Sequence, residues 1–354
     1  MMNRTERKLV LECGEEYRGI GFGADVDRIC EIVFNTAMVG YEEVLSDPAN
    51  ADLGVVMTYP LIGNCGIIEE DLESKIPQTG ALIVRDYNDI PSNFRQTNTL
   101  SEVMEECGIP GITGVDTRRL TRSLRDNGTM RGMICSADTP TEEALLEIKR
   151  TPVRHDAAAR VSTKKKWHMR TAKHKSSVIV IDLGIRLSLV RAFAAGASNV
   201  TVVPWNTSAA EILAAEPDGV VIAGGPGDPH DVPETADTVR ALRGRVPIFG
   251  IGLGCDVAAI ACGAETYRLE CDHRGGNHPV RRLPDGGIIT PYQNHGYAVR
   301  EDSLDGTGLF VTYKDLLDGV IEGIACPQDK LVGVQFEPAA ASPVLDEFHE
   351  LMGR

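Results

Sequence analysis

A glycine-rich stretch, Gly250-Ile251-Gly252-Leu253-Gly254, is the first place in the sequence where the spacing of residues points to chemistry. It follows an apolar run at 246–251 and precedes a helical pattern, which is the setting of a nucleophile elbow. Such an elbow is a sharp turn between a strand and a helix that holds its central side chain exposed. The central residue here is Gly252, which has no side chain. The sequence therefore predicts an elbow without the group that attacks a substrate.

The same stretch permits a second interpretation as the Gly-x-Gly-x-x-Gly fingerprint of a dinucleotide-binding domain. Glu270 lies twenty residues after Gly250, at the spacing of a ribose-binding acid. However, Cys255 replaces the third glycine, and the turn follows the fourth strand of its domain and not the first. Nucleotide binding is thus the less favoured hypothesis.

Three further stretches contain residues that suit binding or catalysis. The turn 224–229 could present backbone N–H groups to an oxyanion, although a simple tight turn is the better explanation from these residues alone. His295 follows a strand-like stretch at 287–291, where a single histidine is more often a hydrogen-bonding residue than a catalyst. The stretch 271–278 contains Cys, Asp and His residues whose types suggest a metal site, although the alignment of its Gly-Gly-Asn-His-Pro end with a known stretch that binds no metal favours a structural role.

The elements around these stretches alternate between strand and helix in the second half of the chain. Strands are predicted at 178–182, 200–203, 219–223 and 246–251, with helices ending near 196 and at 208–216, 235–243 and 255–262. This alternation predicts a mostly parallel sheet flanked by helices, with its sites at the glycine-rich turns after the strands. The first half is a mixed α/β pattern, with strands predicted at 8–11, 29–34, 53–58 and 81–85 and a helix at 117–126.

The 354 residues suggest two domains, and a basic stretch marks the boundary. Residues 149–175 contain ten Lys or Arg and one acid, Asp156, whereas the whole chain has a formal charge of −15. We interpret residues 149–176 as a linker between domains at 1–148 and 177–354. The alternative is a strip that binds an anion or an acidic partner.

Composition excludes several classes of protein. The chain is acidic, which argues against binding to nucleic acid or to an anionic membrane. No apolar run reaches 18 residues, and the N-terminus has no apolar signal segment. The nine cysteines are scattered and no pair is spaced Cys-x-x-Cys, which is typical of reduced thiols in the cytoplasm. There is no Gly-x-x-x-x-Gly-Lys-Ser/Thr loop for ATP.

Several motifs resemble those of the small subunit of carbamoyl phosphate synthetase. They occur in the order that the family has, in both halves of the sequence, and the resemblance covers nearly the whole chain. In the first half they are Phe34–Glu43, Thr58–Asn64, Ser92–Arg95 and Asp116–Thr121. In the second half they are Gly225–Pro229, Gly275–Val280 and Gln293–Tyr297. The resemblance implies an N-terminal domain of that family and a C-terminal class I glutamine amidotransferase domain.

In that family a cysteine attacks the amide of glutamine, a histidine activates the cysteine, and an acid orients the histidine. The family elbow reads Gly-Ile-Cys-Leu-Gly-His-Gln, and the base and acid lie in Phe-His-Pro-Glu. The aligned positions here are Gly252, Glu337 and Ala339, so the resemblance implies that no catalytic residue is competent. The implied substrate-binding positions are Gly225, Gly227, Leu253, Asp256 (a glutamine in the family), Asn294, Gly296 and Tyr297. Ala49 replaces a small polar residue.

These observations lead to one main hypothesis and three alternatives. The main one is a pseudo-glutaminase subunit that supports ammonia-dependent synthesis by a large subunit, with ATP and magnesium used by that partner and no cofactor or metal in this chain. One alternative is a stand-alone protein that binds glutamine or a small amine in the altered pocket. A second is an active glutaminase with Cys255 as a displaced nucleophile. A third is a cation pocket made by Cys255, Asp256 and Glu337 beside His295.

Overall fold

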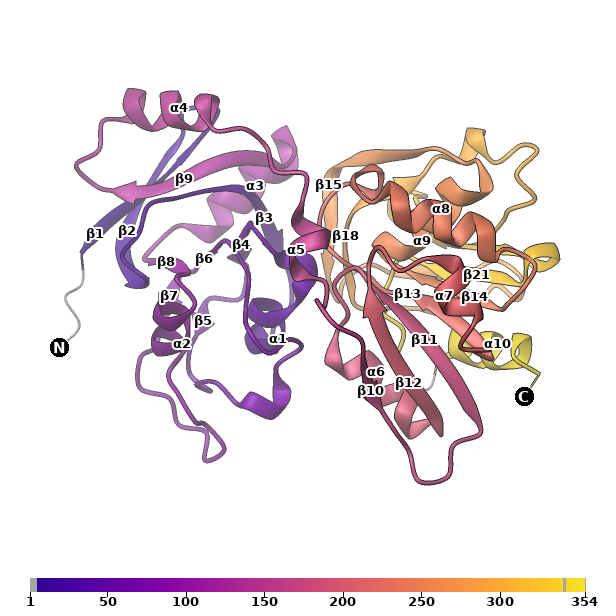
Figure 1. Ribbon diagram of the computed structural model, residues 1–354. Coiled ribbons are helices and arrows are strands. Elements are labelled where there is room, and N and C mark those ends of the chain that lie inside the picture. The colour runs from indigo at the N-terminus through magenta and orange to yellow at the C-terminus, as the bar shows by residue number, and fades with distance from the viewer. Residues whose placement is uncertain (1–4, 340–341, 354) are drawn as a thin grey trace. The chain divides into compact units, whose positions relative to one another are not determined.

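The chain forms two compact units, Met1–Arg154 with Glu270–Arg274 and His155–Leu269 with Gly275–Arg354. The structure is a computed structural model that describes residues 5–339 and 342–353 (Figure 1). The first unit ends six residues later than the sequence boundary at 148, and it includes a short segment from the second half of the chain. Among the described residues, no helix is long and apolar enough to cross a membrane.

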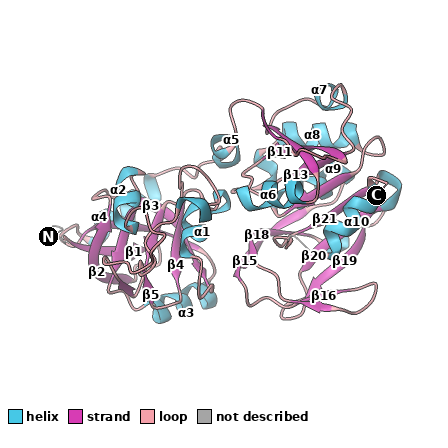
Figure 2. Ribbon diagram, turned by 90° about the horizontal axis from the view of Figure 1, so that it is seen from below, coloured by secondary structure: helices cyan, strands magenta, loops and turns pink. Residues whose placement is uncertain are grey.

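The first unit is built on a closed barrel of seven strands, in the order β1-β2-β8-β6-β4-β3-β9. Four of these strands, β1 to β4, are labelled in Figure 2. Closure pairs every strand on both sides, so the barrel has no open edge. Buried side chains such as Leu9, Ile32 and Ile112 form its core. The strands are Glu6–Leu11 (β1), Glu16–Gly23 (β2), Arg28–Asn35 (β3), Leu53–Met57 (β4), Ala81–Ile83 (β6), Pro110–Thr113 (β8) and Met130–Ser136 (β9).

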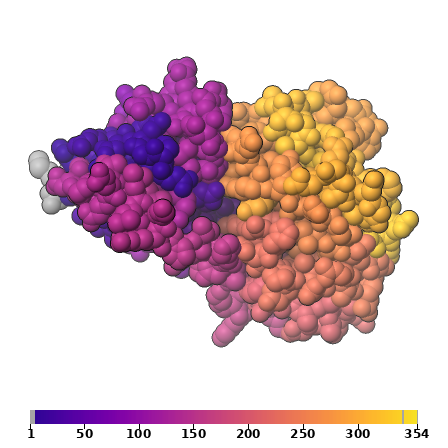
Figure 3. All heavy atoms as spheres, turned by 90° about the horizontal axis from the view of Figure 1, so that it is seen from above, coloured from indigo at the N-terminus to yellow at the C-terminus, as the bar shows by residue number. Residues whose placement is uncertain are grey.

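Among the described residues of this unit, four α-helices and one small sheet surround the barrel strands. The helices are Tyr41–Ser46 (α1), Leu100–Glu106 (α2), Thr117–Asn127 (α3) and Thr141–Arg150 (α4), and the two-stranded sheet pairs Leu61–Ile62 (β5) with Asp86–Tyr87 (β7). A capping box between Thr99 and Glu102 starts α2, and the side chain of Asp116 caps α3. In the space-filling view the indigo N-terminal strands lie beside magenta residues late in the unit, as the pairing of β1 with β9 requires (Figure 3).

The second unit contains a ten-stranded sheet in the order β10-β12-β11-β13-β14-β21-β20-β19-β16-β17. Its central pairs, from β12 to β21, are parallel, and both flanks are antiparallel. The strands are Trp167–Met169 (β10), Ser176–Asp182 (β11), Ser198–Pro204 (β12), Gly219–Ile222 (β13), Ile248–Ile251 (β14), Val280–Arg282 (β16), Ile288–Ile289 (β17), Phe310–Asp315 (β19), Ile321–Cys326 (β20) and Leu331–Val334 (β21). A separate pair joins Thr266–Gly275 (β15) and Gln293–Val299 (β18).

Helices cover both faces of the large sheet, as the sequence predicts. One apolar cluster packs α7, α8 and α9 on one face, and a second packs α6 and α10 on the other. The helices are Ala157–Val161 (α5), Leu187–Ala195 (α6), Ala209–Leu213 (α7), Pro233–Leu242 (α8), Leu253–Cys262 (α9) and Pro343–Leu351 (α10). The predicted α/β class, with a mostly parallel sheet in the second half, is therefore confirmed.

The basic stretch at 149–176 differs from the predicted linker because part of it is regular structure. It contains α5 and the edge strand β10, whose residue Trp167 pairs with Val202 of β12. Trp167 and Met169 pack against the core while His168 between them is exposed. This alternation of partly buried and exposed side chains, with a period of two residues, is typical of a strand. The surrounding lysines make the pattern hard to recognise in the sequence.

Candidate functional site

A sharp turn at Gly252 joins the buried strand β14 to helix α9. Gly252 has φ 51° and ψ −121°, a conformation that glycine adopts at little cost. Its N–H donates to the carbonyl of Val334 on the adjacent strand at 2.8 Å, and its own carbonyl accepts from the N–H of Cys255 at 2.8 Å. The elbow predicted from the sequence is thus present and is held by backbone hydrogen bonds.

Position 252 has room for a side chain although it carries none. A Cβ placed on Gly252 would lie 3.7 Å from both the carbonyl oxygen of Gln335 and the Cα of Gly224, which are ordinary contact distances. The packing around position 252 therefore does not require a glycine there. The turn has the shape and the space of a nucleophile elbow, but it offers no atom that could attack a carbonyl carbon.

The carboxylate of Glu337 lies next to this turn. Its Oε1 is 3.7 Å from the place that a Cβ of Gly224 would occupy, and Gly224 is also one of the two near neighbours of position 252. The N–H of Glu337 donates to the carbonyl of Tyr292 at 2.9 Å, which fixes the backbone of this segment. The structure thus brings Gly252 and Glu337 together around Gly224.

Arg186 supplies the opposite charge. Its Nη1 lies 3.9 Å from Oε2 of Glu337, and both side chains are largely buried, with 15% and 18% exposed. The guanidinium also stacks over the ring of Tyr292, 5.5 Å from its centre. Arg186 could not be predicted as part of this site, because an arginine after a buried strand gives no catalytic or binding pattern in the sequence.

Asp256 occupies a different environment, one that is closed to solvent. Its side chain accepts a 2.6 Å hydrogen bond from Nε2 of Gln335, and the residue is only 1% exposed. Burial raises the pKa of this carboxyl to about 7, and the nearby His295 opposes the rise. Asp256 is therefore a hydrogen-bonded acid of the interior, and its predicted substrate contact stays a prediction.

A buried polar network continues from Gln335. The N–H of Gln335 donates to the carbonyl of Glu322 at 2.9 Å. The carboxylate of Glu322 accepts from Nε2 of Gln293 at 2.8 Å and lies 3.5 Å from Nε2 of His295. Glu322 and Gln335 could not be predicted as neighbours of Asp256 and His295, since only the fold places them beside the helix that carries Asp256.

Cys255 lies in the hydrophobic core and not at the tip of the turn. It is fully buried, and its Sγ lies 2.9 Å from the point where a Cβ of Gly333 would be. Burial, and then the charge of Asp256, raise the pKa of the thiol well above its ordinary value. A buried thiol that stays protonated is a poor nucleophile. These observations contradict the hypothesis of a displaced nucleophile and support a small buried hydrophobe.

The turn after β13 lies at the same edge of the parallel sheet as the elbow, because β13 and β14 are adjacent and parallel. Gly225 packs so closely that a Cβ would approach the carbonyl oxygen of Leu183 to 2.0 Å. Gly227 has φ 93°, and Asp228 ends the turn by accepting from the N–H of His230 at 2.9 Å. This edge can present backbone N–H groups to a ligand at the elbow.

The remaining predicted binding residues lie on β18 and at the start of α9. Asn294 is nearly buried, and the carbonyl of Gly296 accepts from Nη1 of Arg268 at 3.0 Å. The guanidinium of Arg268 also covers the ring of Tyr297, 5.1 Å from its centre. Leu253 is the first residue of α9 and joins the core beneath the sheet edge.

Ala339 and Ala49 carry only methyl groups at their positions. Ala339 is exposed, two residues beyond Glu337, and it offers no acid to orient a base. Ala49 lies in the first unit, where it is buried and its N–H donates to Oδ1 of Asp47 at 2.9 Å. Neither side chain can contribute a proton or a charge.

The predicted cation pocket does not form at the elbow. Within residues 5–339 and 342–353, no group of three or more close His, Cys, Asp or Glu ligands includes Cys255, Asp256 or Glu337. Cys255 points into the apolar core, whereas Glu337 faces Arg186. These three side chains therefore do not converge on one point.

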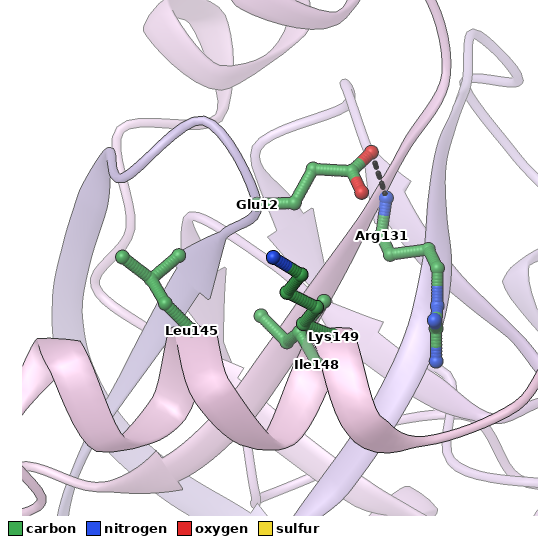
Figure 4. A pocket seen from close by; sticks show the side chains of 5 residues that line it. All are labelled: Glu12, Arg131, Leu145, Ile148 and Lys149. Carbon is green, nitrogen blue, oxygen red and sulfur yellow. Dashed lines mark hydrogen bonds between the residues drawn. The ribbon is translucent and has the colours of Figure 1, made fainter.

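A hollow of about 320 Å³ lies in the first unit between α4 and the strand ends beside it (Figure 4). Leu145, Ile148 and Lys149 line it from the helix, and Glu12 and Arg131 line it from the barrel. Oε1 of Glu12 accepts from the backbone N–H of Arg131 at 3.0 Å. The hollow is lined by none of the residues that the sequence predicts to be catalytic or substrate-binding.

Comparisons with known proteins match both units. Residues 9–134 match the family described as the CPSase domain of the carbamoyl-phosphate synthase small chain, and residues 179–347 match the family of class I glutamine amidotransferases. A solved glutamine amidotransferase from Thermotoga maritima is 18% identical, with a TM-score of 0.37, over 46% of this chain and 76% of its own.

Curated relatives match along nearly the whole length. The carbamoyl phosphate synthase pyrimidine-specific small chain of Halalkalibacterium halodurans is 43% identical over 353 residues, which is 98% of this chain and 97% of the relative. The carbamoyl phosphate synthase small chain of Fusobacterium nucleatum is 43% identical over 349 residues, covering 97% of each chain. That of Listeria innocua is 41% identical over 98% of this chain and 97% of its own.

Proposed function

The chain belongs to the family of carbamoyl phosphate synthase small chains, and from this premise we propose that it is a pseudo-glutaminase subunit. In this role it binds a large chain and supports synthesis of carbamoyl phosphate from free ammonia. The observation that carries the proposal is the elbow at Gly252, which keeps the backbone conformation and the space for a nucleophile but has no side chain.

We assign the three triad positions to Gly252, Glu337 and Ala339. Attack on glutamine needs a nucleophilic side chain that forms a covalent intermediate, and glycine cannot form one. Loss of a nucleophile typically lowers turnover by about 10⁶-fold. Glu337 lacks the imidazole that would accept and return a proton, and Ala339 cannot orient a base. The scaffold is retained, whereas each reacting group is replaced.

The energy-requiring steps belong to the large chain in this proposal. We expect ATP and magnesium to be bound there, because this sequence has no phosphate-binding loop of the Walker type. All nine cysteines are free thiols, which supports a reducing compartment such as the cytoplasm. We propose that the carbamoyl phosphate supplies arginine or pyrimidine synthesis.

A second candidate function is binding of a small amine at the altered elbow. The carboxylate of Glu337 beside Gly224 favours it, because a carboxylate attracts a protonated amine. Arg186 opposes it by supplying the neighbouring cation. Calorimetric titration of the chain with ammonium, simple amines and glutamine tests this candidate, which fails if none of them gives a saturating heat.

The test of the main proposal is glutamine hydrolysis by the purified chain in complex with the large chain from the same source. We expect ammonia release from glutamine at the rate of a blank without protein. Release that saturates with glutamine and disappears on removal of this subunit would overturn the proposal.

A further inference from the structure

Residues 164–175 of the second unit, here called the basic strip, differ in charge from the rest of the chain. They contain six Lys or Arg and no Asp or Glu, whereas the whole chain has a formal charge of −15. All six side chains are exposed: Lys164, Lys165, Lys166, Arg170, Lys173 and Lys175. Blocks of like charge repel one another within a chain and are often segments that bind a partner.

The charges of the basic strip are not neutralised within the structure. Among residues 5–339 and 342–353, no carboxylate forms an ion pair with any of the six side chains. Lys164 donates from Nζ to the carbonyl oxygens of Ala159 at 2.7 Å and Arg160 at 3.3 Å, at the end of α5. An anion can therefore approach the other five cations without breaking an internal ion pair.

The backbone of the basic strip is fixed by hydrogen bonds. Its middle part is β10, which pairs with β12. After β10, the N–H of Thr171 donates to Oδ1 of Asn199 at 3.0 Å, and the N–H of Lys175 donates to the carbonyl of Ala197 at 2.7 Å. The cations before and after this three-residue strand are thus held on either side of it, roughly 10–15 Å apart along the edge. Such preorganisation lowers the entropy cost of binding.

The basic strip lies at an edge of the large sheet. β10 is the first strand in the sheet order, so no other described strand pairs with its outer side. Lysines that protect an edge strand from pairing commonly project from the strand itself. Here His168 is the exposed residue of β10, and the cations flank the strand at both ends. An extended peptide can lie along such an edge with its side chains near the flanking cations.

We propose that the basic strip binds an acidic, extended segment of another protein. The strip offers what such a segment needs, which is an open strand edge bordered by unpaired cations on a fixed backbone. None of its residues belongs to the elbow or its surroundings. The inference therefore goes beyond the proposed function and does not depend on it.

The two other common polyanions fit the basic strip less well. Single-stranded nucleic acid stacks its bases on exposed aromatic rings, and a membrane-surface segment inserts exposed apolar side chains. Trp167 and Met169 are the large apolar side chains of the strip, and both pack against the core. The acidic remainder of the chain also repels a long polyanion or a charged bilayer that extends beyond the strip.

The test titrates the full chain into a fluorescein-labelled peptide of about ten glutamates, which spans at most about 36 Å when extended. Fluorescence anisotropy would be measured at physiological ionic strength, with a peptide of glutamines of the same length for comparison. We expect saturable binding of the glutamate peptide and none of the glutamine peptide. Added salt should weaken the binding, because it screens exposed charges.

Charge-neutralising variants locate the binding on the basic strip. Lys165→Gln/Lys166→Gln removes two cations before β10, and Lys173→Gln/Lys175→Gln removes two after it. We expect each double variant to weaken binding about fivefold and the quadruple variant about twenty-five-fold, since each lost contact is between exposed charges. The thermal midpoint should stay at the wild-type value, because these side chains are exposed.

Lys75→Gln/Lys330→Gln is the matched control, because it removes two exposed lysines outside the basic strip. We expect it to bind the glutamate peptide with wild-type affinity. Absence of saturable binding by the wild type, or equal binding by the wild type and the quadruple variant, would overturn the proposal. Tighter binding of single-stranded DNA or of phosphatidylserine vesicles than of the peptide, lost in the quadruple variant, would assign the strip to that class of partner and refute the inference.

Discussion

Oε2 of Glu337 lies 3.9 Å from Nη1 of Arg186, beside a turn whose tip is Gly252. An ion pair therefore lies beside a tip that has no side chain. Under the proposed triad positions Glu337 replaces the base and Gly252 the nucleophile, which is mutually consistent because a base has no role when nothing remains for it to deprotonate. Position 252 has room for a side chain, so the proposed loss of chemistry is testable by restoring side chains.

We predict that Gly252→Cys folds and acquires an accessible thiol. A side chain in this backbone conformation costs about 1–3 kcal/mol, whereas the contacts of its Cβ are ordinary. Thermal unfolding should show this loss of folding stability, and iodoacetamide should label Gly252→Cys at position 252 in the native protein. Gly252→Ala is the control, with the same loss of stability and no labelling.

We predict measurable glutamine hydrolysis only when the base and the acid are restored as well, in Gly252→Cys/Glu337→His/Ala339→Glu. Each group depends on the others, so a single restoration gives little activity. Ammonia release would be compared across the single, double and triple variants. Absence of activity in a folded triple variant would mean that the elbow and its oxyanion donors no longer fit glutamine.

Cys255 is predicted to be inert in the folded protein. Its thiol is buried and its pKa is raised well above the ordinary value, so little thiolate forms at neutral pH. Iodoacetamide followed by mass spectrometry should modify Cys255 only after denaturation, whereas the exposed Cys13 reacts in the native state. Rapid native modification of Cys255 would revive it as a nucleophile.

Asp256 should make the unfolding free energy fall as pH rises. Burial raises its pKa from 3.8 to about 7, so between these values the folded state holds a proton that the unfolded state has released. Its contribution to stability is full below pH 4 and decreases toward pH 7, by at most about 1.4 kcal/mol per pH unit. Denaturant titrations of Asp256→Asn should be less dependent on pH across this window.

Glu42 is the control for that experiment, because burial raises its pKa to about 7 as well. Glu42→Gln should remove a similar slope, and the two changes should add because the residues lie in different units. If Asp256→Asn keeps the full wild-type slope, the carboxyl of Asp256 is ionised in the folded state at the lower pH.

Gly225→Ala is predicted to destabilise the turn after β13 by about 3 kcal/mol. The new Cβ would come within 2.0 Å of the carbonyl oxygen of Leu183, which belongs to the backbone and cannot rotate away. Gly276→Ala is the matched control, because nothing lies within 4 Å of its added Cβ. Chemical denaturation of both variants would test the difference, and equal stability would contradict the close packing of this turn.

Much of the fold could be predicted from local sequence patterns. The buried run of β14 followed by glycines predicts the elbow, and the strand–helix alternation predicts the parallel sheet. The barrel could not be predicted, because β2 contains three glycines that resemble turn signals and because closure depends on pairing between distant strands. The antiparallel flank from β20 to β17 also lacked a clear pattern.

The site could be predicted only in part. Gly252, Glu337 and Ala339 were assigned to the triad through family motifs, since their own residue types carry no catalytic signal, and this assignment stays a prediction. The surroundings of Arg186, Gln335 and Glu322 depend on side chains that meet across segments far apart in sequence, since Gln335 lies 79 positions after Asp256. Burial of Asp256 likewise follows from packing of α9 on the sheet, which no local pattern reveals, whereas the burial of Cys255 could be expected because free cysteines are often small buried hydrophobes.

The most direct test of the central claim is carbamoyl phosphate synthesis by this chain assembled with its large chain, supplied in parallel with glutamine or with ammonium. We predict synthesis with ammonium and none above background with glutamine. Equal synthesis from both nitrogen sources would contradict the account and require a nucleophile other than the residue at the tip of the elbow.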